Sequence, residues 1–180
     1  MNKQLSLAVI YGSTRRQRRC DQVVAWVLNR IEAHGSFTPL SVDPRSDSTQ
    51  QLAARLNQAD AYLIVTPEYN HGYPADLKAL LDNSDADWAA KPVALVSYGG
   101  ISGGIRAAEQ LRQVLIELHA APTRDSVAFA DVGSHFDGRS EPLNARRYEA
   151  SAQRMLTTLY WWGAALKRAR QQLPYSQRAA

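Results

Sequence analysis

Four arginines within five positions follow the first apolar segment of the chain, and residues of this kind could bind an anion. They lie in the segment 12–21, whose sequence is Gly-Ser-Thr-Arg-Arg-Gln-Arg-Arg-Cys-Asp. Hydroxyl groups, backbone N–H groups and the N-terminus of a following helix all favour a negative charge. Charge-assisted hydrogen bonds are worth roughly 1.5–3 kcal/mol each. We interpret this loop as a phosphate-binding loop; the alternative is a solvated arginine face or a patch for nucleic acid.

The elements that must position this loop follow from the apolar pattern. A short apolar run that stops at a glycine is typical of a buried strand in a parallel sheet, and the following loop lies at the carboxyl edge, where open α/β sheets bind ligands. Strands are predicted at 5–11, 37–42, 61–65, 92–96 and 125–129, and helices at 21–33, 48–57, 74–83, 102–119 and 143–169. This alternation predicts a flavodoxin-like α/β fold, a doubly wound five-stranded parallel sheet of order 2-1-3-4-5 with helices on both faces.

Composition limits the class of protein. The chain has 180 residues, of which 45% are hydrophobic and 21% charged, so we expect a single domain over residues 1–180 with a frayed tail from about residue 171. The single cysteine excludes an internal disulfide, and no apolar run could cross a bilayer, which makes the cytoplasm the expected location. A net charge of +4 suits anionic ligands but is too small to argue for nucleic acid.

Three loops are expected to share one crevice. In the predicted strand order, the loops at 12–19, 66–74 and 97–104 leave neighbouring strands at the same edge. Together they offer an anion cradle, aromatic and amide groups, and a flat glycine floor, which suits a mononucleotide with a planar ring. The P-loop and dinucleotide-binding motifs are absent. Cys20 does not begin a phosphatase loop, because Trp26 stands where an arginine would be needed.

The sequence resembles the NAD(P)H-dependent FMN reductases, the flavodoxin-like group that includes quinone, azo-dye and chromate reductases. The resemblance covers about residues 5–166 and depends on three ordered motifs. They are Gly12-Ser13-Thr14-Arg15 with Arg18; Thr66-Pro67-Glu68-Tyr69-Asn70 with Pro74, Leu77 and Lys78; and Ser97-Tyr98-Gly99-Gly100 with Gly103, Gly104, Arg106 and Ala107.

The resemblance implies a set of FMN-binding residues. Those expected to hold the phosphate are Ser13, Arg15, Arg18 and the backbone near Cys20. Those expected along the pyrimidine side of the ring, largely through backbone atoms, are Pro67, Glu68, Tyr69 and Asn70. Those expected along its other edge are Ser97, Tyr98, Gly99 and Gly100. The chain departs from many relatives at Cys20, at His71 and at Gly72-Tyr73, which bears on the substrate-side wall.

Several of these residues could instead have a purely structural role. Glu68 and Asn70 could instead cap the helix that follows, Tyr69 could pack rather than stack on the ring, and a loop histidine such as His71 is more often inert than catalytic. The four histidines show no metal spacing with acidic partners, so we expect no metal site. The pair at 161–162, both tryptophan, is expected in the core or at a subunit contact.

By the same resemblance the chain would be an FMN-dependent NAD(P)H oxidoreductase. A hydride from NADPH or NADH would pass through flavin N5 to a small acceptor (a quinone, free flavin, azo compound or metal oxyanion) in ping-pong fashion, with no side chain required as a catalytic residue. Family members are typically dimers, so a homodimer or a dimer of dimers is expected, with the helix at 74–83 as a candidate contact. The alternatives are a flavodoxin-type electron carrier and a non-catalytic nucleotide-binding or sensing module.

Overall fold

The computed structural model describes residues 4–84, 88–136, 141–173 and 175. Five parallel strands form one sheet in the order β2-β1-β3-β4-β5, which confirms the predicted flavodoxin-like arrangement. The strands are β1 (Leu5–Tyr11), β2 (Phe37–Val42), β3 (Ala61–Pro67), β4 (Pro92–Tyr98) and β5 (Ala121–Phe129).

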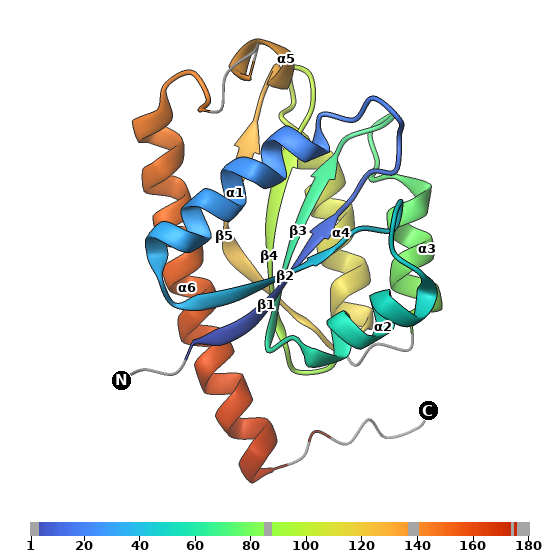
Figure 1. Cartoon of the computed structure of the whole chain (residues 1–180), viewed down its shortest axis with the longest axis vertical. Coiled ribbons are helices and arrows are strands. Elements are labelled where there is room, and N and C mark those ends of the chain that lie inside the picture. The colour runs from blue at the N-terminus through green and yellow to red at the C-terminus, as the bar shows by residue number, and fades with distance from the viewer. Residues whose placement is uncertain (1–3, 85–87, 137–140, 174, 176–180) are drawn as a thin grey trace.

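Helices cover both faces of this sheet (Figure 1). They are α1 (Cys20–His34), α2 (Thr49–Gln58), α3 (Ala75–Asn83), α4 (Ile105–Glu117), α5 (Val132–His135) and α6 (Ala145–Gln172). α1 and α6 pack on one face, while α2, α3 and α4 pack on the other, and the C-terminal part of α6 extends beyond the sheet.

Alternate residues of each strand enter one of the two cores. In β1, Leu7 and Val9 belong to the core under α1 and α6, whereas Ala8 and Ile10 belong to the core under α2, α3 and α4. Because both faces are covered, every residue of β3 and β4 is buried, which explains why these strands appear as continuous apolar runs. The sheet therefore has no open face, and its carboxyl edge is left for a ligand.

Two boundaries near residue 100 differ from the sequence prediction. β4 extends two residues further than predicted, because Ser97 and Tyr98 still pair in register with β3. α4 begins three residues later than predicted, because Gly103 and Gly104 have φ angles of +62° and +81°, and this left-handed conformation interrupts a helix. The loop between β4 and α4 is therefore a rigid left-handed bend.

Further differences lie toward the C-terminus. β5 begins four residues earlier than predicted, and the segment predicted as a loop at 131–142 contains the short helix α5. Most of the predicted frayed tail lies outside the described residues. Trp161 and Trp162 are 63% and 41% exposed, so their prediction as core residues is wrong, while the alternative of a subunit contact stays a prediction. No helix in the described ranges is long and apolar enough to span a membrane.

Alanine at Gly104 is expected to destabilise the protein by about 3 kcal/mol. A Cβ atom there would lie 2.8 Å from the backbone nitrogen of Tyr98 and 2.9 Å from its carbonyl oxygen, at a φ of +81°. Gly35→Ala is the matched control: φ is +73°, no atom lies within 4 Å of a Cβ, and a loss of about 1 kcal/mol is expected. Urea unfolding measures both, and equal losses would show that the close approach to Tyr98 costs nothing.

Candidate functional site

The loops that follow β1, β3 and β4 leave the sheet at its carboxyl edge, and backbone hydrogen bonds place their first residues. The N–H of Gly12 donates to the carbonyl of Val65 at 2.8 Å, and the N–H of Glu68 donates to the carbonyl of Tyr98 at 3.0 Å. A Cβ at position 12 would lie 2.6 Å from the Val65 oxygen, so this approach requires glycine. The first loop therefore begins in contact with the end of β3.

Ser13 and Tyr69 join the first and second loops. Ser13 is fully buried, and its hydroxyl oxygen lies 2.8 Å from the phenolic oxygen of Tyr69. The guanidinium carbon of Arg15 lies 3.6 Å from the ring centroid of Tyr69, which is a cation–π contact. Tyr69 thus packs against the first loop. Stacking of its ring on a flavin, the other role considered for it, stays a prediction. Three of the predicted site residues are in mutual contact here.

The backbone of the first loop presents unpaired donors. Within the described part of the chain, the N–H groups of residues 14–17 donate no hydrogen bond. α1 begins directly after this loop, and no side chain caps its N-terminus. Unpaired N–H groups beside a helix N-terminus can bind an anion such as a phosphate.

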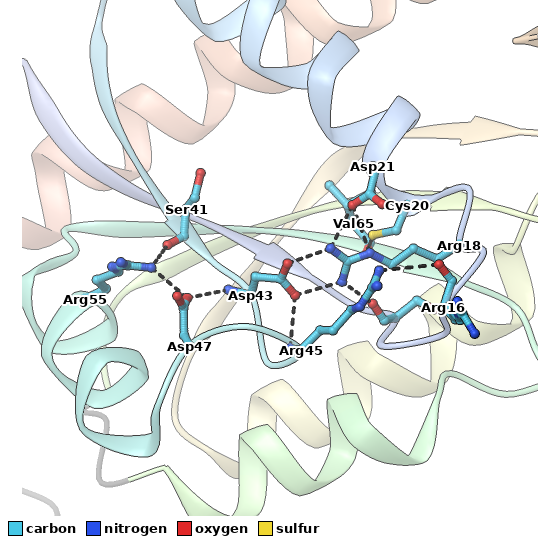
Figure 2. A network of polar contacts seen from close by, with 11 residues as sticks. Arg16, Arg18, Cys20, Asp21, Ser41, Asp43, Arg45, Asp47, Arg55 and Val65 are labelled. Atoms are coloured by element: carbon cyan, nitrogen blue, oxygen red, sulfur yellow. Dashed lines mark hydrogen bonds and ion pairs between the residues drawn. The ribbon is translucent and has the colours of Figure 1, made fainter. Parts of the chain in front are cut away.

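Arg18, in contrast, is paired within the protein (Figure 2). It donates to both carboxylate oxygens of Asp43 at 2.7 and 2.5 Å, through Nε to Asp21 at 2.8 Å, and to the carbonyl of Ser13 at 2.6 Å. A terminal nitrogen also lies 2.7 Å from the Asp21 carboxylate as an ion pair. The hydrogen bonds engage four of the five N–H donors of an arginine. Its side chain is only 5% exposed. The side chain of Arg18 is thus bonded mainly to protein groups, and its predicted role as a phosphate ligand stays a prediction.

The Arg18–Asp43 pair also changes the titration of both groups. The hydrogen bonds to Asp43 raise the pKa of Arg18. Burial would raise the pKa of Asp43, but the hydrogen bonds from Arg18 and from the backbone of Arg45 outweigh burial, so that the pKa of Asp43 is lowered. Both groups are therefore charged at neutral pH.

The side chains of Cys20 and Tyr98 lie in the core under α1 and α6. Burial raises the pKa of the Cys20 thiol to about 11, so the thiol is protonated at neutral pH. Burial, and then the nearby Cys20, raises the pKa of Tyr98, whose phenolic oxygen has no hydrogen-bond partner in the described residues. Of these two predicted residues, only backbone atoms are available to a ligand at the loop surface.

Glu68 joins the second and third loops. Its carboxylate accepts from the Ser102 hydroxyl at 2.9 Å, from the Arg106 backbone N–H at 3.3 Å and from Nε of Arg106 at 2.7 Å. Burial acts to raise the pKa of Glu68, but these hydrogen bonds outweigh it and the pKa is lowered. The carboxylate thus binds the first turn of α4, rather than capping α3, which directly follows its own loop and has no side-chain cap.

A tight turn at Asn70 and His71 completes the second loop. Tyr69 and Gly72 exchange two backbone hydrogen bonds of 2.8 and 3.0 Å, and the two residues between them have φ angles of +50° and +69°. Such values define a type I′ turn. The His71 ring nitrogen lies 2.9 Å from a terminal nitrogen of Arg106, so this strained turn is fastened to α4.

The third loop, after β4, has few side-chain groups that a ligand could contact, so it would contact a ligand mainly through its backbone. The Ser97 hydroxyl is buried and donates to the carbonyl of Gly103 at 2.8 Å, so it is not available to a ligand. Pro67 ends β3 beside Tyr98. No atom lies within 4 Å of a Cβ placed on Gly100. There is open space beside Gly100, and the predicted glycine floor for a ring stays a prediction.

Residues outside the predicted set hold these loops in place. Asp43, Ser102 and Arg106 supply the contacts, and only Arg106 belonged to a motif. Asp43 directly follows the strand predicted at 37–42 and lies outside the three predicted loops. The signal that could have found it is the strand order, because the loop after β2 lies beside the loop after β1. Among the residues that the structure describes, no group of three or more His, Cys, Asp or Glu could hold a metal ion.

The chain is similar to known proteins in sequence and in fold. An NAD(P)H-dependent FMN reductase of Schizosaccharomyces pombe is 33% identical over 140 residues, which cover 65% of this chain and 70% of the relative. A quinone reductase of Escherichia coli is 41% identical over 78 residues, 41% of this chain and 42% of that protein. The structure of FerB, a flavoenzyme NAD(P)H:(acceptor) oxidoreductase from Paracoccus denitrificans, is similar in fold, with a TM-score of 0.68, 18% identity and coverage of 86% and 97% of the two chains.

The family profile extends across all three loops. The family described as NADPH-dependent FMN reductase matches residues 5–134, which run from the start of β1 into α5. This range contains the unpaired N–H groups, the Ser13–Tyr69 contact and the glycines of the third loop. The chain therefore belongs to the NADPH-dependent FMN reductase family.

Proposed function

We propose that the three loops bind FMN and that the protein is a single-domain oxidoreductase that passes reducing equivalents from NAD(P)H to a small acceptor. The observation that carries this proposal is the run of unpaired N–H groups at residues 14–17, in a chain of this family. A phosphate monoester is the ligand that such a donor set suits. The glycine floor of the third loop leaves room for a planar ring beside it.

The donor set fits the phosphate of FMN with one change from the motif. The backbone N–H groups of residues 14–17 and the guanidinium of Arg15 would hold the phosphate. Arg15 forms no ion pair with a carboxylate in the described ranges. Arg18 already uses four of its five donors within the protein and would not contact the phosphate.

The other two loops would meet the ring mainly through backbone atoms. Pro67, Glu68, Tyr69 and Asn70 would line the pyrimidine side, and residues 97–100 would line the opposite edge. The Glu68 carboxylate and the Ser97 hydroxyl are already bonded within the protein. Their contribution would therefore be to fix the loop backbone that faces the ring.

The chemistry that FMN supplies when bound is transfer of a hydride from NAD(P)H through N5 to the acceptor in two half-reactions. The described side chains of the site need not act as acid or base. Glu68 is held as a carboxylate by Ser102 and Arg106, and Cys20 is held as a buried thiol. The protein would position both substrates and leave proton exchange to water.

A quinone is the acceptor class that the relatives favour. The Escherichia coli relative is named a quinone reductase, and relatives from Arabidopsis thaliana and Oryza sativa carry NADPH:quinone oxidoreductase names. We also propose a homodimer. The leucines of α3, namely Leu77, Leu80 and Leu81, lie in the core of the chain, so α3 would contact a partner only through its opposite, exposed face. These assignments are proposals for this chain.

Purified protein is expected to bind FMN, to bleach the flavin absorbance on anaerobic addition of NADPH, and to oxidise NADPH continuously once a quinone is present. The reason is that the nicotinamide of NADPH and the acceptor would occupy the same site beside the flavin, one after the other. Absorbance spectra and stopped-flow mixing measure each step. Bleaching that requires an added reductase would instead indicate an electron carrier, and FMN binding without any reduction would indicate a sensing module.

Arg15→Ala is expected to weaken FMN binding by roughly 10- to 100-fold, since a hydrogen bond to a charged group is worth about 1.5–3 kcal/mol. Titration of the apoprotein by quenching of flavin fluorescence measures the change. Arg124→Ala is the control, because Arg124 is an exposed arginine of β5 outside the three loops. Equal affinities of the Arg15 variant and the wild type would contradict a phosphate contact by this residue.

Cys20 is expected to react slowly with a disulfide reagent at pH 8 in the folded protein and rapidly in urea. A pKa raised to about 11 leaves little thiolate at that pH, and the side chain is fully buried. The rate should rise with pH only as the thiol ionises or the protein unfolds. Fast labelling of the native protein would mean that the thiol is accessible and ionised.

A further inference from the structure

Arg18 and Asp43 form the best-bonded polar pair near the first loop. Their side chains are 5% and 16% exposed, and Asp43 holds the guanidinium with both carboxylate oxygens. The same guanidinium donates to the carbonyl of Ser13 at 2.6 Å. The pair therefore holds one particular peptide group of the loop.

The orientation of that peptide group decides where the next N–H points. The described chain contains no cis peptide bond, and in a trans peptide the C=O and N–H point in opposite directions. Because Arg18 holds the carbonyl of Ser13, the N–H of Thr14 is directed away from Arg18. This N–H is the first of the four unpaired donors.

Asp43 also contacts the backbone of a residue whose side chain reaches the loop. It accepts the backbone N–H of Arg45 at 3.1 Å, and the exposed side chain of Arg45 donates to the carbonyl of Arg16 at 3.4 Å. By the same geometry the N–H of Gln17 is directed away from Arg45. The contact through Arg18 is direct and buried, so it is the one that the inference uses.

Asp43 is itself fixed from the other side (Figure 2). Its backbone N–H donates to Asp47 at 2.9 Å. Asp47 is ion-paired with Arg55 of α2 at 2.6 Å, and Arg55 also donates to the carbonyl of Ser41 at 2.7 Å. The chain of contacts anchors the first loop to β2 and α2, which are packed elements of the fold.

We propose that Asp43 and Arg18 are positioning residues for phosphate recognition: they direct the N–H groups of the first loop toward the phosphate without touching it. This inference rests on the proposed FMN site. If the pair has this role, it makes the protein prefer FMN over riboflavin, which has the same ring but no phosphate.

The substitution Asp43→Asn separates this role from direct binding by Arg18. Removing a negative charge near the cradle would by itself strengthen binding of an anion. If Arg18 were the phosphate ligand, its release from Asp43 would also strengthen FMN binding. Loss of the orientation of the loop predicts the opposite sign, a weakening of FMN binding by roughly 10- to 100-fold with riboflavin binding unchanged.

The experiment titrates the apoprotein with FMN and with riboflavin. The quantity compared is the dissociation constant of riboflavin divided by that of FMN, which measures the preference for FMN. Asp60→Asn is the matched control, because Asp60 is 13% exposed, is ion-paired with Lys167 at 2.7 Å and accepts the backbone N–H of Ser6 at 3.0 Å. It lies at the amino edge of the sheet, directly before β3. This variant should keep the wild-type ratio even if it is less stable.

Two further measurements keep the inference testable if Asp43→Asn does not fold. Arg18→Lys retains the charge but cannot bridge both oxygens of Asp43. The preference for FMN over riboflavin should therefore fall in this variant, as in Asp43→Asn. In the wild type, the Arg18 Nε–H resonance should change little on adding FMN, while the amide resonances of residues 14–17 shift.

The outcomes are distinct. An unchanged or increased preference for FMN in Asp43→Asn, or equal losses for both flavins, would overturn the positioning role while leaving the proposed function in place. A large shift of the Arg18 resonance on binding would also overturn it. Failure of the wild type to bind FMN at all would overturn the proposed function together with this inference.

Discussion

A parallel sheet leaves backbone donors without partners where its strands end. The N–H of Gly12 still pairs with β3 through Val65, but the residues after it have no strand beside them. Both faces of the sheet are covered by helices, so the carboxyl edge is where those donors can meet a ligand. The position of the site follows from this shortage of acceptors, and the particular side chains of the loops adapt it to a phosphate and a ring.

Two arginines three positions apart, Arg15 and Arg18, make different contacts in this loop. Arg18 is buried and bonded to Asp43, whereas Arg15 lies over the ring of Tyr69 and keeps its charge available. Residue type and spacing cannot separate these roles, because the partner of Arg18 is 25 positions away on the loop after β2. Both arginines nevertheless contact the same loop region that the motif marks, Arg18 through the carbonyl of Ser13 and Arg15 through Tyr69.

The fold was predictable because it depends on patterns that are local in sequence. Buried strands and amphipathic helices alternate, and the observed order 2-1-3-4-5 is one of the few that right-handed crossovers allow for a doubly wound sheet. The start of α4 was misplaced because an apolar helical pattern cannot show that Gly103 and Gly104 adopt positive φ. Within the candidate site, the three loops were expected at one edge of the sheet from the strand order, while the contacts of Arg18 and Cys20 depend on burial, which becomes visible only once distant loops are packed together.

One side-chain link connects each neighbouring pair of loops in spatial order. Asp43 and Arg18 join the loops after β2 and β1, Ser13 and Tyr69 join those after β1 and β3, and Glu68 joins the loop after β3 to the start of α4. The outer links include ion pairs, whereas the middle link combines the hydroxyl contact with the cation–π contact of Arg15 on Tyr69, each of which is typically worth about 1 kcal/mol. A site held in this way is organised before a ligand arrives. Any adjustment on binding would meet the least resistance between the first and second loops, where phosphate and ring would be joined.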